Sequence, residues 1–223
     1  MSPPALLIDG GPSAAVTLAL AHGAGAPMDS PFMTAITDRL VERGHRVARF
    51  EFPYMAARRT TGTKRPPDRQ PVLLATWRTV IDTLGGPRAV VVGGKSLGGR
   101  MASMVADGGA RGLVCLGYPF HAPAQPDKPR IDHLRTLTLP ALIVQGTRDP
   151  FGKPEEVAGY SLPPTIQITW ITDGDHDLKP RKTTGRTHNQ ALDEAVNAVD
   201  AYLRNVMETA LSAVENRLRV FDR

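Results

Sequence analysis

A serine set between glycines, in Gly94-Lys-Ser-Leu-Gly98, constrains the fold of this chain more than any other feature. Residues 88–93 before it are rich in valine and predict a strand buried on both faces, and apolar residues recur at helical spacing from Leu97 onward. A serine on a sharp turn from strand to helix is exposed above the sheet, and side chains in place of the glycines would collide with the neighbouring elements. The pattern therefore predicts Ser96 as a nucleophile in an α/β fold. The alternative is a glycine-rich turn that contains a serine by chance.

The partners that a serine nucleophile needs follow it along the chain. Asp149 comes after a predicted strand at 141–145, and His176 comes after a predicted strand at 166–171. A histidine removes the serine proton, and a carboxylate on its far nitrogen fixes the tautomer and stabilises the imidazolium. Ser96, Asp149 and His176 are therefore predicted as catalytic residues. Other acids beside the histidine are weaker candidates, because adjacent residues of one loop rarely point at each other: Asp173, Asp175 and Asp177.

A tetrahedral intermediate also needs hydrogen-bond donors for its oxyanion. The expected donors are the backbone N–H groups of Leu97, directly after the nucleophile, and of Ala24, in the glycine turn after a predicted strand at 16–21. His22, at the start of that turn, is expected to hold the loop through hydrogen bonds. His121 is expected either to line the substrate pocket or to lie in a solvated loop.

Predicted strands and helices alternate along the chain, which indicates a mostly parallel sheet with helices on both faces. The expected strands are residues 16–21, 46–52, 88–93, 113–116, 141–145 and 166–171. Residues 54–71 are rich in glycine, proline and basic side chains and predict a long loop. On the ligand-binding side of the sheet, Arg58 and Arg59 of this loop are candidate substrate-binding residues for an anionic substrate. The alternative is a solvated charged loop.

Residues 188–218 contain neither glycine nor proline and predict a long C-terminal helix. At about 1.5 Å per residue, such a helix approaches about 45 Å, comparable with the width expected of the domain. Its apolar stripe continues beyond the part that the domain should cover, through Met207, Leu211, Val214 and Leu218. Two solutions remain open: a homodimer through this helix, or a chain that folds back after a break near Asn205.

The composition is typical of one globular domain over residues 1–223, with 41% hydrophobic and 22% charged residues. The single cysteine, Cys115, lies in an apolar run, which excludes an internal disulfide and suits a reducing cytoplasm. No apolar stretch is long enough to cross a membrane. The net charge of +5 comes without interleaved aromatic and basic residues, so no nucleic-acid partner is expected. The histidines lack the spacing of metal ligands, so neither a metal nor a cofactor is expected.

Several segments together resemble a known family, the lid-poor, dienelactone-hydrolase-related branch of the α/β-hydrolases. The likeness is greatest to bacterial proteins similar to the hydrolase-like domain of subunit 3 of the NSL acetyltransferase complex. The segments that carry it are residues 22–32, 52–55, 65–68, 93–100, 145–151 and 173–178. The resemblance implies a sheet of about six parallel strands with minimal or no lid, and a triad of Ser96, Asp149 and His176. Dienelactone hydrolases have a cysteine where this chain has Ser96, so their substrate is not carried over.

Two functions of different classes are consistent with these residues. The first is hydrolysis of a small carboxylic ester, or a thioester, through an acyl-enzyme on Ser96. The alternative is a non-catalytic or weakly catalytic interaction scaffold that retains the hydrolase fold. The presence of all three residues, in the order typical of this fold, favours the enzyme, since a scaffold does not need to keep them in register. An amidase would use the same residues, and the sequence does not separate it from an esterase.

Overall fold

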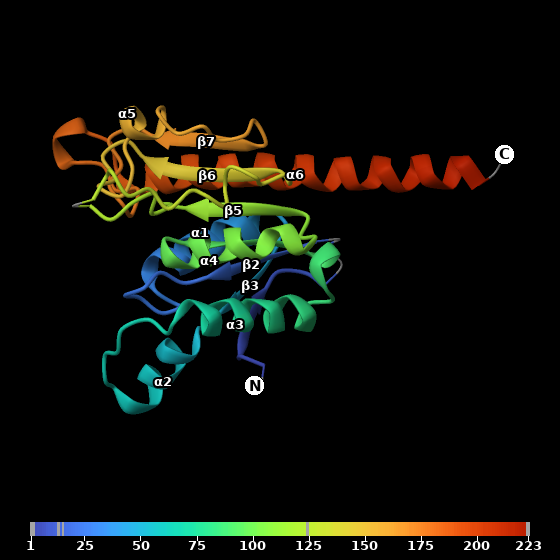
Figure 1. The fold of residues 1–223 in the computed structure, drawn as a ribbon, viewed down its shortest axis with the longest axis horizontal. Helices are drawn as coiled ribbons and strands as arrows, with labels where there is room; N and C mark the ends of the chain where they lie inside the picture. The colour runs from blue at the N-terminus through green and yellow to red at the C-terminus, as the bar shows by residue number, and fades with distance from the viewer. Residues whose placement is uncertain (1–2, 13, 15, 124, 222–223) are drawn as a thin grey trace.

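A seven-stranded sheet lies at the centre of the structure (Figure 1). The computed structural model describes the backbone of residues 3–12, 14, 16–123 and 125–221, and the side chains up to residue 209. The strands are β1 (Leu6–Asp9), β2 (Thr17–Ala21), β3 (Arg46–Phe50), β4 (Val90–Lys95), β5 (Gly112–Leu116), β6 (Ala141–Gly146) and β7 (Ile166–Ile171). Their order across the sheet is β1-β3-β2-β4-β5-β6-β7, and all neighbouring pairs are parallel except β1 with β3.

Helices cover both faces of this sheet. They are α1 (Pro31–Glu42), α2 (Pro53–Thr61), α3 (Gln70–Thr83), α4 (Leu97–Val105), α5 (Pro154–Val157) and α6 (His188–Phe221), with short 3-10 turns at Pro87–Ala89, Ala106–Gly108 and Lys182–Thr184. Trp77 of α3 and Met101 of α4 share one core cluster with Val90 and Val92 of β4. Val91 points to the opposite face, into the cluster that α1 and α6 cover. Because successive side chains of a strand alternate between faces, β4 is apolar along its whole valine run.

The α/β class and the six expected strands are confirmed, and the sheet contains one further strand beyond these six. The seventh strand, β1, pairs antiparallel with β3 at the edge of the sheet. It has only four residues, and its Leu7 and Ile8 are the large hydrophobic side chains that remain exposed among those that the structure describes. A short edge strand that is only partly buried shows neither the alternation nor the length by which a strand is detected in a sequence.

The expected loop at 54–71 is also partly wrong, because its first half forms α2. Pro53 occupies the first turn of this helix, where its missing N–H costs nothing, and Gly62 ends the helix in the left-handed conformation, with φ 67°. Tyr54 and Met55 are buried against the sheet and anchor the helix. Arg58 and Arg59, two of the basic residues that suggested a loop, therefore lie on a helix whose other face is apolar.

The C-terminal helix α6 is continuous from His188 to Phe221, so the alternative of a break near Asn205 is wrong. Its first half packs on the sheet through Leu192, Val196 and Val199, and its last turns extend beyond the other elements (Figure 1). Met207 still packs against the core, whereas the side chains of Leu211, Val214 and Leu218 lie outside the described residues. Within the described residues, none of the helices combines the length and the apolar character that a membrane span requires.

The parallel strands bring several loops together at one edge of the sheet. The segments after β2, β4, β6 and β7 all leave the carboxyl ends of neighbouring or nearby strands. They contain Ala24, Ser96, Asp149 and His176 in turn. An open parallel sheet binds ligands at this edge, so the fold gathers the candidate residues where a site is expected.

Candidate active site

Ser96 stands on a strained turn between β4 and α4. Its backbone has φ 51° and ψ −115°, a conformation that a residue with a side chain rarely adopts. The neighbouring glycine Gly98 permits this turn, because a Cβ atom there would collide with the backbone carbonyl oxygen of Ala21 in β2. The sequence predicts that a larger residue in place of the glycine would collide with a neighbouring element, and in the structure that element is the strand β2. Such strain persists only where the surroundings fix it, and it is typical of functional sites.

A chain of hydrogen bonds links Ser96 to two residues that lie far from it in the sequence. His176 Nε2 lies 2.9 Å from Ser96 Oγ, and His176 Nδ1 lies 2.8 Å from Asp149 Oδ2. The Asp149 side chain is fully buried, whereas the His176 side chain is 23% exposed. The structure therefore brings together the three residues predicted as catalytic, with the imidazole between the hydroxyl and the carboxylate. This geometry allows His176 to accept the hydroxyl proton while Asp149 holds the opposite N–H.

The acidic neighbours of His176 have other partners. Asp173 Oδ1 forms ion pairs with Arg148 and Arg181, at 3.0 and 2.6 Å, and the hydrogen bonds from Arg181 lower the pKa of this carboxyl group. Asp175 Oδ1 accepts hydrogen bonds from the backbone N–H groups of Asp177 and Lys179. These carboxylates shape the loop that carries His176, as expected of acids close in sequence.

The loop after β2 is held by His22, as the sequence suggested. His22 is fully buried; its Nδ1 lies 2.6 Å from the carbonyl oxygen of Gly23, and its Nε2 accepts a hydrogen bond from the N–H of Phe52. Both contacts require the neutral imidazole with its proton on Nδ1. Burial lowers the pKa of His22, which favours that neutral form.

The two predicted oxyanion donors belong to the loop after β2 and to the first residue of α4. Ala24 follows the loop that His22 holds and lines the pocket, and Leu97 begins α4 directly after Ser96. Among the described residues, neither backbone N–H has a hydrogen-bond partner. Both groups therefore remain available to a ligand at Ser96.

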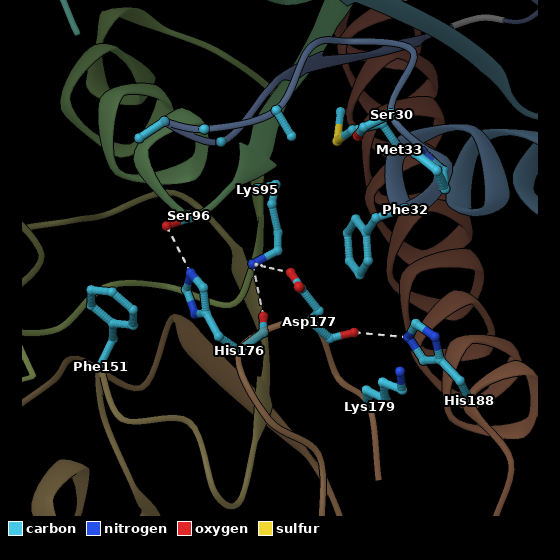
Figure 2. A pocket seen from close by; sticks show the side chains of 15 residues that line it. Ser30, Phe32, Met33, Lys95, Ser96, Phe151, His176, Asp177, Lys179 and His188 are labelled. Carbon is cyan, nitrogen blue, oxygen red and sulfur yellow. Dashed lines mark hydrogen bonds and ion pairs between the residues drawn. The ribbon is translucent and has the colours of Figure 1, made fainter. Parts of the chain in front are cut away.

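A pocket of about 610 Å³ opens beside Ser96 (Figure 2). One wall is the loop after β2 and the start of α1, and the opposite wall is the loop after β7 together with the start of α6. The residues that line it are Gly23, Ala24, Gly25, Ala26, Ser30, Pro31, Phe32, Met33, Lys95, Ser96, Phe151, His176, Asp177, Lys179 and His188. The Phe151 ring lies 4.4 Å from the imidazole of His176, centroid to centroid, and so limits the positions that the base can take. This volume is in the range of small-molecule sites.

Lys95 is a feature of this pocket that sequence reasoning missed. Its side chain is 8% exposed, and its Nζ donates a hydrogen bond of 2.7 Å to the carbonyl oxygen of His176. The Asp177 carboxylate lies 3.2 Å from the same ammonium group (Figure 2). Burial lowers the pKa of Lys95, and the charge of Asp177 opposes that shift. A charged residue at the end of an otherwise apolar buried strand is the signal that could have drawn attention to it.

The predicted substrate-binding residues do not line this pocket. Arg59 forms ion pairs with Glu51 and Asp29, each at 2.7 Å, and Arg58 Nη1 donates to the carbonyl oxygen of Gly25. These two arginines border a separate, smaller hollow.

His121 is also placed elsewhere, with 1% of its surface exposed. Its Nε2 lies 3.2 Å from Glu156 Oε2, and its Nδ1 lies 2.9 Å from the carbonyl oxygen of Ala122. The imidazole therefore ties α5 to the segment after β5. Neither of the alternatives expected for His121, a pocket wall or a solvated loop, describes this position.

Metal ligands do not gather anywhere in the described part of the chain, since no group of three or more histidine, cysteine, aspartate or glutamate residues there could hold an ion. Cys115 is buried, and burial raises the pKa of its thiol, which disfavours the thiolate.

Comparisons with known proteins agree with this fold. Residues 14–204 match the family described as an alpha/beta hydrolase domain. Among solved structures, the chain is similar to a serine hydrolase without a lid from Xanthomonas campestris (19% identity, 90% of this chain and 88% of that chain, TM-score 0.64). It is also similar to the dienelactone hydrolase of Anabaena variabilis (18%, 90% and 90%, 0.66) and to the esterase domain of a Rhodothermus marinus protein (17%, 91% and 92%, 0.65).

These likenesses bear out the fold that the sequence resemblance implied. At such low sequence identities, similarity to the solved structures shows the fold alone. The family match is of a different kind, because it covers most of the sequence. The chain belongs to the alpha/beta-hydrolase family.

Proposed function

We propose that this protein is a serine hydrolase that cleaves a small carboxylic ester, or a thioester, through an acyl-enzyme on Ser96. The observation that carries the proposal is the unbroken hydrogen-bond chain from Ser96 Oγ through His176 to the buried Asp149 carboxylate. In this role Ser96, Asp149 and His176 form a catalytic triad. The free N–H groups of Ala24 and Leu97 form its oxyanion hole.

Acylation begins when His176 Nε2 takes the proton of Ser96 Oγ and the oxygen attacks the ester carbonyl carbon. The carbonyl oxygen becomes an oxyanion, which accepts hydrogen bonds from the two N–H groups. Asp149 stabilises the imidazolium through its hydrogen bond to Nδ1. When the intermediate collapses, the bond to the leaving alcohol or thiol breaks, and that group takes the proton from Nε2.

Deacylation repeats these steps with water. His176 removes a proton from a water molecule, whose oxygen attacks the acyl carbon. The bond to Ser96 Oγ then breaks, Ser96 regains its proton from His176, and the carboxylic acid leaves. In both half-reactions the protein positions the reacting groups and stabilises charge, and the overall reaction consumes only the ester and one water molecule.

We further propose an ester that carries an anionic group. Support comes from within the pocket rather than from the arginines of α2. The Lys95 ammonium is balanced by Asp177, whereas Lys179 lines the pocket and forms no ion pair with any described residue. An unpaired ammonium group at the rim of the pocket attracts an anionic substrate, and screening by salt limits the distance over which this attraction acts.

Two properties of the whole chain belong to the same proposal. The lone, buried Cys115 suits a reducing compartment, and we place the enzyme in the cytoplasm. The last turns of α6 extend beyond the sheet, which suits a homodimer through this helix.

The proposal is tested by hydrolysis of a short-chain p-nitrophenyl ester by the wild-type protein and by Ser96→Ala. Turnover should fall by about a thousandfold to a millionfold, because the nucleophile and its base act as a unit. Ser103→Ala is a matched control, since Ser103 is a buried serine that also contacts a histidine, with its Oγ 2.8 Å from His133 Nε2. Equal turnover by wild type and Ser96→Ala would contradict the proposal and favour the alternative of an interaction scaffold.

A further inference from the structure

A buried amide lies beside the carboxylate of Asp149. Gln145 is the last residue but one of β6 and is fully buried, and it does not line the pocket. Its Nε2 donates a hydrogen bond of 2.9 Å to Asp149 Oδ2, the same oxygen that faces His176 Nδ1. None of the steps described above uses this residue.

The surroundings allow only one orientation of the Gln145 amide. Its Oε1 accepts a hydrogen bond of 2.7 Å from the N–H of Tyr118. Its Nε2 faces three acceptors: Asp149 Oδ2, and the carbonyl oxygens of Tyr118 and Gly152, each at 3.2 Å. Turning the amide over would bring its oxygen against these acceptors and its NH₂ group against an N–H. The donor therefore always faces Asp149.

Asp149 depends on few donors for its buried charge. Besides His176 Nδ1, the donors to its carboxylate are the Gln145 amide and the N–H of Phe151, at 2.9 Å to Oδ1. No lysine or arginine among the described residues forms an ion pair with it. A buried carboxylate is retained in its charged form only if such hydrogen bonds replace water. Gln145 is the side chain that both supplies one of them and limits rotation of the carboxylate.

We propose that Gln145 is a positioning residue, which fixes the Asp149 carboxylate so that Oδ2 stays directed at His176 Nδ1. This inference rests on the proposed function, because the role matters only if Asp149 and His176 assist Ser96. Gln145 acts through Asp149 and touches no substrate. It also joins the segment after β5, at Tyr118, to the loop that carries the acid, at Gly152.

The test compares Gln145→Met with Gln145→Glu in ester hydrolysis across the pH range. Gln145→Met keeps the length of the side chain but removes the donor, so kcat should fall by about 10- to 100-fold while KM changes by less than about threefold. Gln145→Glu keeps the acceptor for Tyr118. In its protonated form the introduced acid donates to Asp149 as the amide does, and in its ionised form it sets a second negative charge against Asp149.

The pH profile is the readout that a merely structural role would not move. Relative to wild type, kcat of Gln145→Glu should fall by about 10- to 100-fold between about pH 6 and about pH 9, whereas the deficit of Gln145→Met should be the same at each pH. Ser103→Ala, another buried polar residue, should follow the wild-type profile. Thermal melting shows whether each variant is folded, and if Gln145→Met is not, the profile of Gln145→Glu decides.

The outcomes separate this inference from the proposed function. If wild type and Ser103→Ala hydrolyse the ester and Gln145→Glu follows their profile at every pH, the positioning role is overturned and the hydrolase stands. Wild-type kcat in a folded Gln145→Met would overturn it equally. If the wild type neither hydrolyses the ester nor reacts with a fluorophosphonate, the proposed function fails, and the inference fails with it.

Discussion

At the scale of single residues, Lys95 is the side chain whose role the structure reveals most directly. It precedes the nucleophile in sequence and holds the carbonyl oxygen of His176 across a separation of 81 residues. Lys95→Met should therefore lower kcat for a neutral ester by about 10- to 100-fold, because the loop that carries the base loses its anchor. Lys182→Met, at an exposed lysine outside the pocket, is the control. Wild-type kinetics in a folded Lys95→Met would show that the contact does not matter.

Lys179 is the residue on which the preference for an anionic ester depends. Two p-nitrophenyl esters of matched length, one ending in a carboxylate and one in a methyl group, should differ in kcat/KM at low salt, with the anionic ester preferred. Lys179→Met should reduce this ratio by about two- to tenfold, and added salt should do the same, since a partly exposed charge is screened. Equal ratios of kcat/KM for the anionic and neutral esters in wild type, Lys179→Met and Lys182→Met would contradict a role of Lys179 in binding an anionic substrate.

One buried histidine, His22, and one half-buried histidine, His133, predict how stability depends on pH. Burial lowers the pKa of both His22 and His133 from the ordinary value of 6.5. The unfolded chain therefore binds more protons than the folded protein as the pH falls below about 6.5, so stability decreases in that range and is retained above it. The urea midpoint should drop on acidification, and it should drop less in His22→Gln and in His133→Gln. An identical drop in all three proteins would assign the effect to other groups.

Sequence order was enough to predict Ser96, Asp149 and His176 as a group, because the chemistry fixes the residue types and the fold fixes their places after strands. Lys95 and Gln145 escaped notice for a physical reason. Each acts through the residues that it contacts, and the sequence does not show which residues a polar side chain in a buried strand contacts. Arg58 and Arg59 illustrate the opposite error, since proximity to the correct edge of the sheet does not place a side chain in the pocket.

At the scale of elements, the turn between β4 and α4 depends on close backbone approach. Gly98→Ala should destabilise the protein by about 2 kcal/mol or more, because the added Cβ would meet the backbone of Ala21 and His22, which cannot move without displacing β2. Gly108→Ala is the matched control, since open space surrounds a Cβ atom there. Thermal melting of the two variants should differ by several degrees at least. Equal melting temperatures would mean that the turn tolerates a side chain.

Secondary structure was predictable where the apolar pattern was long and was missed where it was short. The valine run of β4 and the periodic residues of α4 and α6 identified these elements from sequence alone. The edge strand β1 did not stand out because it is short. The helix α2 did not stand out because the basic, glycine and proline residues around it masked the buried pair Tyr54 and Met55. Pairing with β3 forms the strand β1, and burial of Tyr54 and Met55 anchors the helix α2; the sequence displays neither contact.

At the scale of the whole molecule, α6 sets the expectation for self-association. At about 1.5 Å per residue its 34 residues span about 50 Å, which is longer than the strands it packs against. In sedimentation we expect the full chain to be a dimer and a chain ending at Asn205 to be a monomer. The shortened chain keeps Tyr202, whose hydroxyl bonds to the carbonyl oxygen of Pro140, so the sheet contact is retained. A monomer in both cases would rule out the dimer.

The central claim, that Ser96 is an activated nucleophile, is tested most directly by covalent labelling with a fluorophosphonate followed by mass spectrometry. Phosphonylation needs a serine whose proton is removed by a neighbouring base, so it reports on Ser96 and His176 together, whatever the natural substrate is. We predict one adduct per chain, on the peptide that contains Ser96, absent in Ser96→Ala and retained in Ser103→Ala. An unlabelled wild-type protein, or an adduct that persists in Ser96→Ala, would contradict the account.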